Sequence, residues 1–285
     1  MKLRFLTALV LIPPAIYLIG WSPRWLLLAA VIVVTELCLY EFFQICRHAG
    51  FQPITPLAYV GSAAICAVRS RETPGTGTPA LALLIALALL VLGVALATSR
   101  DLKTYLNSAA ITLFGMVYIG LSLSCLLPLR FSPWGHGSLG PAGVADGVTG
   151  RNLMLLLFLV IWADDTLAYL VGRAVGRRML FPSISPKKTL EGSVAGLVGS
   201  LLVAWGFADL FWKTASLKTV ILLAALVAVL GQVGDLAESA MKRSANVKDS
   251  GTVLPGHGGL LDRVDSLLLG APILWLTLAI AEFWR

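Results

Sequence analysis

Charged residues are scarce in this chain of 285 residues. Lysine, arginine, aspartate and glutamate together make up 13% of it, whereas hydrophobic residues make up 58%. Soluble domains usually carry about a quarter charged residues. This shortage, with a mean hydropathy of +0.85, nearly excludes a water-soluble enzyme and also excludes disordered and collagen-like chains.

Cysteine is also sparse. The four cysteines stand singly within or beside apolar runs, without a Cys-x-x-Cys pair and without a histidine at zinc-binding spacing. We therefore expect Cys38, Cys46, Cys66 and Cys125 to be inert, buried, small apolar residues.

Long apolar runs fill most of the chain instead. A membrane-spanning helix needs about 20 mostly apolar residues. We find nine candidates, of which the third is short, so that the number could be eight. The candidates lie near 5–21, 25–45, 57–68, 80–98, 109–129, 152–171, 192–212, 219–235 and 266–283. The sequence thus predicts an all-α polytopic membrane protein with about nine transmembrane helices, the first retained because it lacks a signal-peptide cleavage site.

Positive charge predicts the orientation in the membrane. The formal net charge is +7, and with the N-terminus in the cytoplasm most lysines and arginines fall in the inner segments, as the positive-inside rule requires. The two most polar loops, 173–190 and 236–265, then face the cytoplasm. For a bacterial chain this predicts the inner (plasma) membrane, with the active site on its cytoplasmic side.

Negative charge predicts the domain organisation. A carboxylate inside a membrane costs roughly 2.5 to 3.5 kcal/mol, so clustered carboxylates need a reason. Most of the 15 acidic residues lie after residue 145. We therefore predict a transmembrane scaffold over 1–130, a Gly/Pro-rich outer loop over 131–151 and a catalytic transmembrane region over 152–285, in which the C-terminal half forms a cytoplasm-facing polar cavity.

A polar stripe follows the eighth apolar run. Asp235, Glu238, Ser239, Lys242 and Arg243 recur at the spacing of one helix face. Such a stripe can line an aqueous cavity. The alternative is a solvated helix end with an ion pair between Glu238 and Lys242.

A glycine-rich loop comes next. Lys248 and Asp249 precede the glycines of 255–259, whose small size lets backbone N–H groups approach a phosphate. Asp262 and Asp265 then open the last apolar run, where a cation and a helix N-terminus could meet. His257 could shape the loop, donate to a phosphate or transfer a proton.

Oxygen ligands without cysteine indicate Mg²⁺ or Mn²⁺ rather than zinc. We expect Asp235 and Asp262 to be the ligands, with any second cation about 3.5 to 4 Å away. Neutralisation of phosphate oxygens falls to the basic residues of this segment. These are Lys242, Arg243, Lys248 and Arg263.

The other polar loop is strongly basic. Its positive charges could anchor the loop at the inner face or bind an anionic lipid headgroup. They are Arg173, Arg177, Arg178, Lys187 and Lys188. Ser185 before Pro186 suits the start of a helix.

Four further acids lie inside apolar runs. At least one of Asp164 and Asp165 should face a polar cavity. Glu36 and Glu41 lie on different faces of the second run, and for both we favour a structural interpretation, with Glu41 able to snorkel to the interface.

The segments Ser-Ala-Met-Lys-Arg at 239–243, Lys-Asp at 248–249, Pro-Gly-His-Gly-Gly at 255–259 and Asp-Arg-Val-Asp at 262–265 resemble the signature of the phosphatidate cytidylyltransferase (CDP-diacylglycerol synthase) family. The similarity extends to Trp162, Asp165, Tyr169 and the run 185–192, and so covers roughly the C-terminal half. Leu190 replaces an aromatic residue that the family pattern leads us to expect.

The resemblance implies transfer of CMP from CTP to phosphatidate, which gives CDP-diacylglycerol and pyrophosphate. It also implies dependence on a divalent cation, a homodimer and assignment of Asp235 and Asp262 to the metal centre; no nucleic-acid partner is expected. The expected catalytic residues are Asp235, Lys242, Arg243, Lys248, Asp249, His257, Asp262, Arg263 and Asp265. The expected substrate-binding residues are Asp165, Arg173, Arg177, Ser185, Lys187, Lys188, Glu191, Glu238, Ser239, Gly256, Gly258 and Gly259.

Two rival functions fit part of the pattern. A CTP-dependent polyprenol or dolichol kinase would need a similar charged cavity, but it would release CDP and a lipid phosphate. An ion-coupled transporter would also bury carboxylates, without needing the glycine loop.

Overall fold

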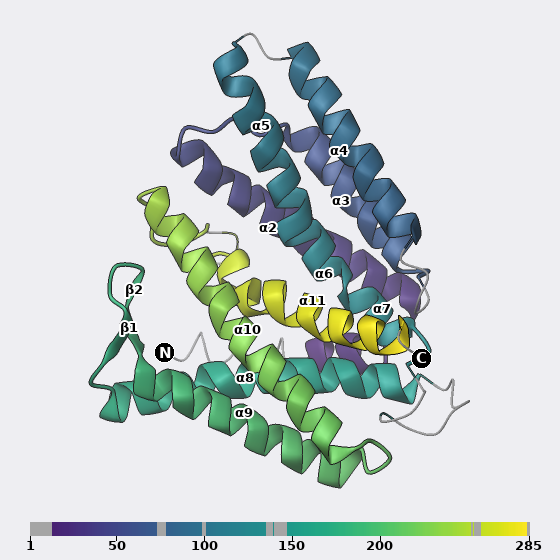
Figure 1. Cartoon of the computed structure of the whole chain (residues 1–285), viewed down its shortest axis with the longest axis vertical. Coiled ribbons are helices and arrows are strands. Elements are labelled where there is room, and N and C mark those ends of the chain that lie inside the picture. The colour runs from purple at the N-terminus through teal and green to yellow at the C-terminus, as the bar shows by residue number, and fades with distance from the viewer. Residues whose placement is uncertain are drawn as a thin grey trace. The chain divides into compact units, whose positions relative to one another are not determined.

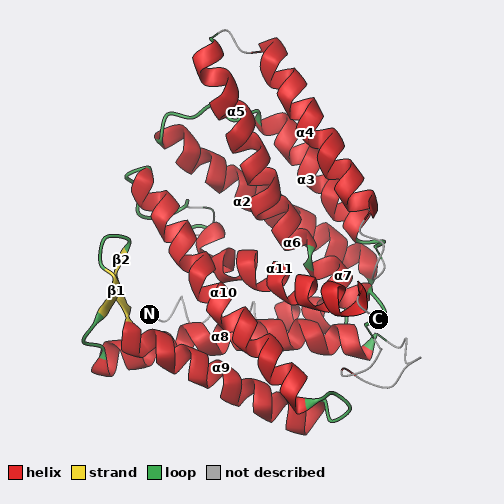
Figure 2. Ribbon diagram, in the orientation of Figure 1, coloured by secondary structure: helices red, strands yellow, loops and turns green. Residues whose placement is uncertain are grey.

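The computed structural model describes residues 13–72, 78–98, 101–134, 139, 147–251, 253 and 258–283, apart from the side chains of Lys103 and Phe283. These residues are mostly helical (Figure 2). The helices in chain order are α2 (Arg24–His48), α3 (Thr55–Arg69), α4 (Thr78–Thr98), α5 (Leu102–Gly115), the π-helix η1 (Met116–Leu121), α6 (Ser122–Ser124), α7 (Leu126–Phe131), α8 (Val148–Val175), α9 (Leu190–Phe211), α10 (Leu217–Ser244) and α11 (Leu261–Phe283). Figure 1 shows their course.

Seven of the described helical segments are long and apolar enough to cross a bilayer, which makes this an integral membrane protein. They are α2, α4, the run Thr104–Phe131, α8, α9, α10 and Leu261–Glu282. The polytopic α-helical class is confirmed, and the described residues account for seven of the nine predicted spans.

The other two predicted spans fare differently. The run 57–68 is a helix, α3, but its 15 residues rise only about 22 Å, short of the roughly 30 Å hydrocarbon core. Of the run 5–21, residues 13–20 are helical, and the part before residue 13 lies outside the described residues. Much of the predicted outer loop 131–151 also lies outside them.

The chain divides into two compact units that do not follow chain order. The first unit comprises Met1–Pro128 and Met241–Val264, and the second comprises Leu129–Ala240 and Asp265–Arg285. Helices α10 and α11 therefore each contribute to both. The segment that carries the glycine-rich loop groups with the N-terminal helices.

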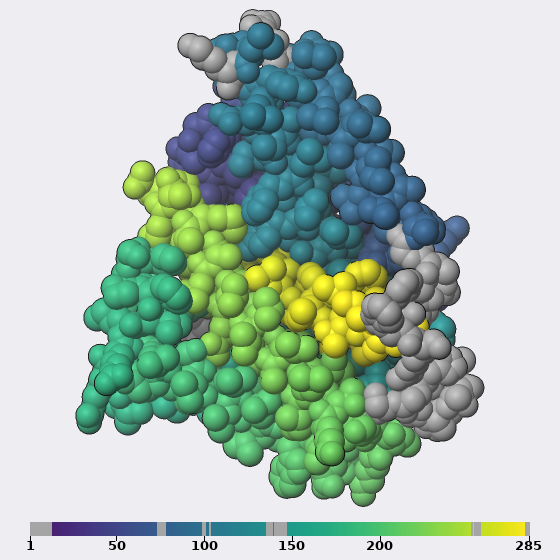
Figure 3. Space-filling model, in the orientation of Figure 1, coloured from purple at the N-terminus to yellow at the C-terminus, as the bar shows by residue number. Residues whose placement is uncertain are grey.

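The first unit is built around α2, which packs against α3 and η1. Phe42 and Phe43 of α2 are buried there, and the ring of Phe42 lies 6.4 Å from that of Tyr118. Helix η1 can come close to α3 because Gly120 has no side chain: a Cβ there would lie 2.5 Å from the Ser62 hydroxyl. Helix α4 keeps most of its leucines exposed and lies on the visible surface (Figure 3), which suits contact with lipid tails.

The second unit rests on α8 and α9, which lie side by side (Figure 1). Glycines on α9 allow the close approach, since a Cβ on Gly196 would lie 2.8 Å from the Asp164 carbonyl oxygen. The Ser200 hydroxyl donates to the Val160 carbonyl at 2.9 Å. Internal partners of this kind satisfy polar groups where water is absent.

A β-hairpin joins α8 to α9, and the all-α prediction missed it. Strands β1 (Met179–Phe181) and β2 (Ser185–Thr189) are antiparallel. Ser185 therefore opens a strand, and the prediction that it starts a helix is wrong. Helix α9 begins at Leu190, because the hydroxyl of Thr189 caps it by accepting from the Gly192 N–H at 3.2 Å.

Candidate active site

Predicted site residues and the residues that contact them form two groups, one in each unit. The glycine-loop group, in the first unit, consists of the predicted Lys242, Gly259 and Asp262 together with Ser250 and Glu41, which the sequence did not single out for the site. The hairpin group, in the second unit, consists of Asp164, Lys188, Glu191, Gln232 and Asp235.

The end of α10 turns the chain into the glycine-rich loop. The Val247 N–H donates to the Lys242 carbonyl and the Asn246 N–H to the Arg243 carbonyl, a Schellman arrangement with Asn246 in the left-handed region at φ 56°. The Arg243 guanidinium also donates to the Val247 carbonyl at 3.0 Å. Lys248 and Asp249 follow, and both are exposed.

Asp262 gathers three donors in the first turn of α11. Its Oδ1 accepts the Lys242 ammonium at 2.5 Å, and its Oδ2 accepts the backbone N–H groups of Ser250 and Gly259, each at 3.1 Å. The Lys242 and Asp262 side chains are only 11% and 17% exposed. The carboxylate is thus fixed on both oxygens by charge-assisted hydrogen bonds.

Glu41 joins the N-terminal helices to this loop. Its carboxylate accepts the Leu260 N–H at 3.0 Å, the Leu261 N–H at 2.7 Å and the Ser250 hydroxyl at 3.2 Å. The residue is 1% exposed, so the idea that it snorkels to the interface is wrong. The only sequence signal was an acid in a largely apolar helix, which gave no indication of its partners.

The glycines of the loop make room for these acids. A Cβ on Gly259 would lie 1.8 Å from the Ser250 hydroxyl and 2.7 Å from Glu41 Oε2, and a Cβ on Gly251 would lie 2.6 Å from Glu41 Oε1. Gly258 takes φ +81°, which favours glycine. The N–H groups of Ser250, Gly259, Leu260 and Leu261 all reach carboxylates. Gly256 and His257 lie outside the described residues, so the phosphate cradle stays a prediction.

The hairpin group is more open. Lys188 on β2 forms an ion pair with Asp235 on α10, and the two side chains are 29% and 27% exposed. Glu191 accepts the N–H groups of Arg177 and Arg178 at 3.1 and 3.2 Å, which ties the basic loop to the start of α9. Arg173, Arg177 and Lys187 are themselves exposed.

Gln232 holds Asp164 in place. Its amide nitrogen donates to Asp164 Oδ1 at 2.9 Å and to the Ser193 carbonyl at 3.0 Å, and the Ser193 hydroxyl donates to the Gln232 carbonyl oxygen. Asp164 is buried, and this contact satisfies it. Its neighbour Asp165 is exposed and lies near enough to Asp235 to interact electrostatically.

Acids gather around Asp265 in the same unit. Asp165, Asp235 and Glu238 are all close enough to it to interact electrostatically. Even so, no three histidine, cysteine or acidic side chains among the described residues are arranged to hold a metal ion. Asp235 belongs to the second unit and Asp262 to the first, so their predicted pairing around a cation stays a prediction.

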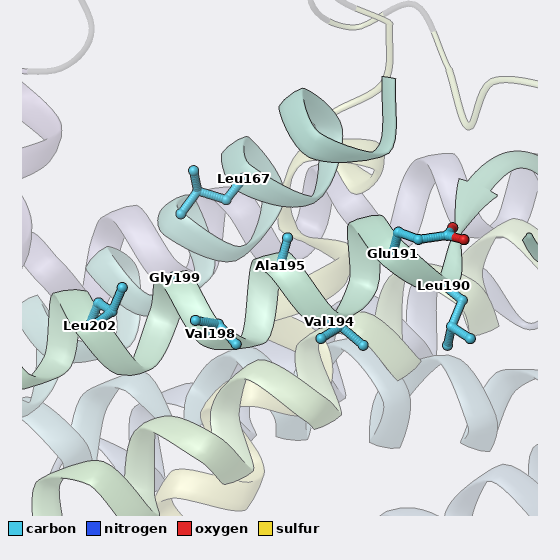
Figure 4. Close-up of a pocket in the computed structure, with 8 residues that line it drawn as sticks. All are labelled: Leu167, Leu190, Glu191, Val194, Ala195, Val198, Gly199 and Leu202. Carbon is cyan, nitrogen blue, oxygen red and sulfur yellow. The ribbon is translucent and has the colours of Figure 1, made fainter. Parts of the chain in front are cut away.

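An open groove of about 570 Å³ runs along α9. It is lined by Leu167 of α8 and by residues of α9 between Leu190 and Leu202 (Figure 4). Glu191 is its one ionisable lining residue, and that carboxylate is already engaged by backbone N–H groups. The groove therefore presents an apolar surface and no reactive group.

Comparison with known proteins identifies what the chain is similar to. Residues 2–281 match the model of a family described as the cytidylyltransferase family. A Synechocystis protein named phosphatidate cytidylyltransferase is 36% identical over 272 residues, 88% of this chain and 87% of its own. Proteins of the same name from Staphylococcus haemolyticus and Bacillus subtilis are 32% identical over 282 residues (96% and 97%) and 44% identical over 131 residues (46% and 49%).

Proposed function

The chain belongs to the cytidylyltransferase family, and on that premise we propose how it makes CDP-diacylglycerol. It is a nucleotidyltransferase of phospholipid biosynthesis that transfers CMP from CTP to phosphatidate and releases pyrophosphate. The observation that carries this function is similarity along nearly the whole chain to relatives named for the reaction.

The chemistry needs no covalent enzyme intermediate. A phosphate oxygen of phosphatidate attacks the α-phosphorus of CTP, the new P–O bond forms, and the bond from that phosphorus to the bridging oxygen of pyrophosphate breaks. The attacking phosphate is already anionic near neutral pH and needs little help from a base. Catalysis is then mostly positioning and stabilisation of charge.

We assign the two substrates to different groups. The exposed basic hairpin loop, with Lys187 and Lys188, suits the lipid headgroup, which arrives from the bilayer surface. The glycine-loop group suits the triphosphate, because Lys242 belongs to it and Arg263 follows Asp262 directly, and both offer positive charge. The contact of Lys242 with Asp262 supports this role by holding its ammonium within the loop.

The donor set suits a hard divalent cation. Asp235 and Asp262 both offer carboxylate oxygens, the ligands that such a cation prefers. Each is paired with a lysine ammonium, which would have to give way when the cation binds. We propose that the two aspartates are the protein ligands of Mg²⁺ or Mn²⁺ and that a second cation takes part in the reaction. When bound, such an ion neutralises phosphate charge.

Location and assembly complete the proposal. The similar proteins are bacterial, so we place the enzyme in the inner membrane. The bias of lysine and arginine toward one side supports a cytoplasmic active site, where CTP is available. The resemblance to the family supports a homodimer.

One assay tests the function. Purified protein in detergent is given labelled CTP and phosphatidate, with and without Mg²⁺, and the products are separated. We expect CDP-diacylglycerol and pyrophosphate only when all components are present. Lipid phosphate with CDP would identify a lipid kinase instead, and no consumption of CTP would overturn the proposal.

A further inference from the structure

Glu41 lies in an unusual place for a carboxylate. It belongs to α2, a candidate membrane span, seven residues before that helix ends at His48, and it is 1% exposed. An acid in such a position is costly unless its oxygens are satisfied. Among the described residues, its hydrogen-bond donors are Ser250, Leu260 and Leu261, which flank part of the family signature.

The carboxylate holds that segment at both ends. Ser250 lies where the loop begins, and Leu260 and Leu261 lie where α11 begins. The first N–H groups of a helix have no partner within the helix, and a negative charge there is favourable. Glu41 thus serves as a cap that reaches α11 from a different helix.

The same two loop ends hold Asp262. Its Oδ2 accepts the N–H groups of Ser250 and Gly259. Ser250 itself contacts Glu41, and Gly259 directly precedes Leu260, which also contacts Glu41. Loss of the Glu41 contacts would free both donors to move, and with them the carboxylate that pairs with Lys242. Glu41 can therefore act on the reaction without touching a substrate.

We propose that Glu41 is a positioning residue that sets the geometry of Asp262 and Lys242 through Ser250 and the backbone of 259–261. The proposal rests on the proposed function, since it assigns Glu41 to that same site. The tight packing supports it, because a Cβ on Gly251 or Gly259 would collide with the Glu41 carboxylate, and a Cβ on Gly259 would also collide with the Ser250 hydroxyl.

The test compares Glu41→Gln with Glu36→Gln. Glutamine keeps the size of the side chain but loses the charge and replaces one acceptor oxygen with an N–H donor. The variant side chain therefore cannot accept from the N–H groups of both Leu260 and Leu261 as the two carboxylate oxygens do. Glu36 is a matched control, because it is an acid of the same helix at intermediate exposure, five residues away and on another face. Expression level, elution volume of the detergent-solubilised protein in size-exclusion chromatography and thermal unfolding are measured for both variants.

Two readouts follow. Hydrogen–deuterium exchange should become faster in peptides covering 250–251 and 258–262 of Glu41→Gln and stay unchanged elsewhere. The kcat should fall about 10- to 100-fold, as loss of a charge-assisted hydrogen bond allows, with a smaller change in the KM for phosphatidate. Ser250→Ala, which removes one of the three contacts, should show the same pattern in weaker form, and Glu36→Gln should match the parent protein.

The outcomes are separable. Faster exchange throughout the first unit, or a kcat no lower than that of Glu36→Gln, would overturn the positioning role. If Glu41→Gln fails to fold, Ser250→Ala decides on the same two readouts. If the parent protein makes no CDP-diacylglycerol, the proposed function fails, whereas the exchange data still report whether Glu41 orders the loop.

Discussion

The glycine-loop group and the hairpin group hold negative charge in different ways. Asp262 and Glu41 are held largely by backbone N–H groups of Ser250 and residues 259–261, and a Cβ on Gly251 or Gly259 would collide with their surroundings. Asp235 is held by one long lysine side chain, and both partners are more than a quarter exposed. The first arrangement therefore restricts the carboxylates more than the second.

This difference matches the two tasks of the reaction. Transfer of a nucleotidyl group depends on exact placement of charge around one phosphorus, and a misplacement of about 1 Å can cost 10²-fold in rate. Capture of a lipid headgroup at a membrane surface depends more on total positive charge. We therefore expect changes in the glycine-loop group, and of the proposed metal ligand Asp235, to lower kcat. Changes of the basic residues of the hairpin should raise KM.

The largest expected effect comes from Asp262→Asn. The amide keeps the shape but cannot balance the Lys242 ammonium or serve as an anionic ligand, so turnover should fall by at least about 10³-fold. Asp209→Asn, an exposed acid of α9, is the control. Initial rates with saturating CTP and phosphatidate provide the measurement, and a variant that keeps a tenth of the activity would contradict the assignment.

Gly259→Ala should follow, with a loss of about 10²-fold in kcat. Its Cβ would lie 1.8 Å from the Ser250 hydroxyl and 2.8 Å from the Gly251 backbone nitrogen, so the backbone of the loop must shift. Gly93→Ala in α4 is the matched control, because a Cβ there meets nothing within 4 Å and alanine favours the helix by about 0.5 to 1 kcal/mol. Melting curves and kcat should separate the two; equal activity would show that the loop tolerates movement.

A moderate effect is expected from Lys187→Ala combined with Lys188→Ala. Removal of two positive charges near the proposed headgroup site should raise the KM for phosphatidate about 5- to 10-fold, and the KM for CTP by less. Mixed micelles of fixed detergent and varied phosphatidate give the first value. Equal changes in both constants would argue against separate locations for the two substrates.

The smallest effect is expected from salt. The half-buried Lys188–Asp235 pair and the exposed basic loop are screened as the Debye length falls from about 10 Å at 0.1 M to a few ångströms at 1 M. The KM for phosphatidate should therefore rise about two- to threefold in high salt, with little change in kcat. A kcat that depends on salt while the KM for phosphatidate stays constant would contradict the assignment of lipid binding to the exposed charges of the hairpin.

Long-range apolar patterning made the membrane fold predictable. Most predicted spans lie within helices of the structure, because about 20 apolar residues in a row have few alternatives to a helix in lipid. The hairpin 179–189 escaped because its strands are three and five residues long, and its sequence mixes charged, proline and apolar residues without strict alternation. Its pairing depends on the closing turn rather than on any periodic signal.

Part of the candidate site could be predicted where its residues belong to one segment of the sequence. Lys242 and Asp262 were both chosen from the signature, but their contact with each other was not predicted. Glu41 was not predictable as part of the site, because its partners lie 209 to 220 positions further along the chain and no local sequence pattern indicates them. The glycines were recognised as important, but the atoms that require their small size became evident only in three dimensions.

That separation along the chain also bears on biosynthesis. Glu41 enters the bilayer with one of the earliest helices, whereas Ser250, Leu260 and Leu261 leave the ribosome only as the last helix is being made. Until then the nascent chain carries a buried acid whose eventual donors do not yet exist. A prematurely terminated product therefore cannot assemble this half of the enzyme, however well its first helices have inserted.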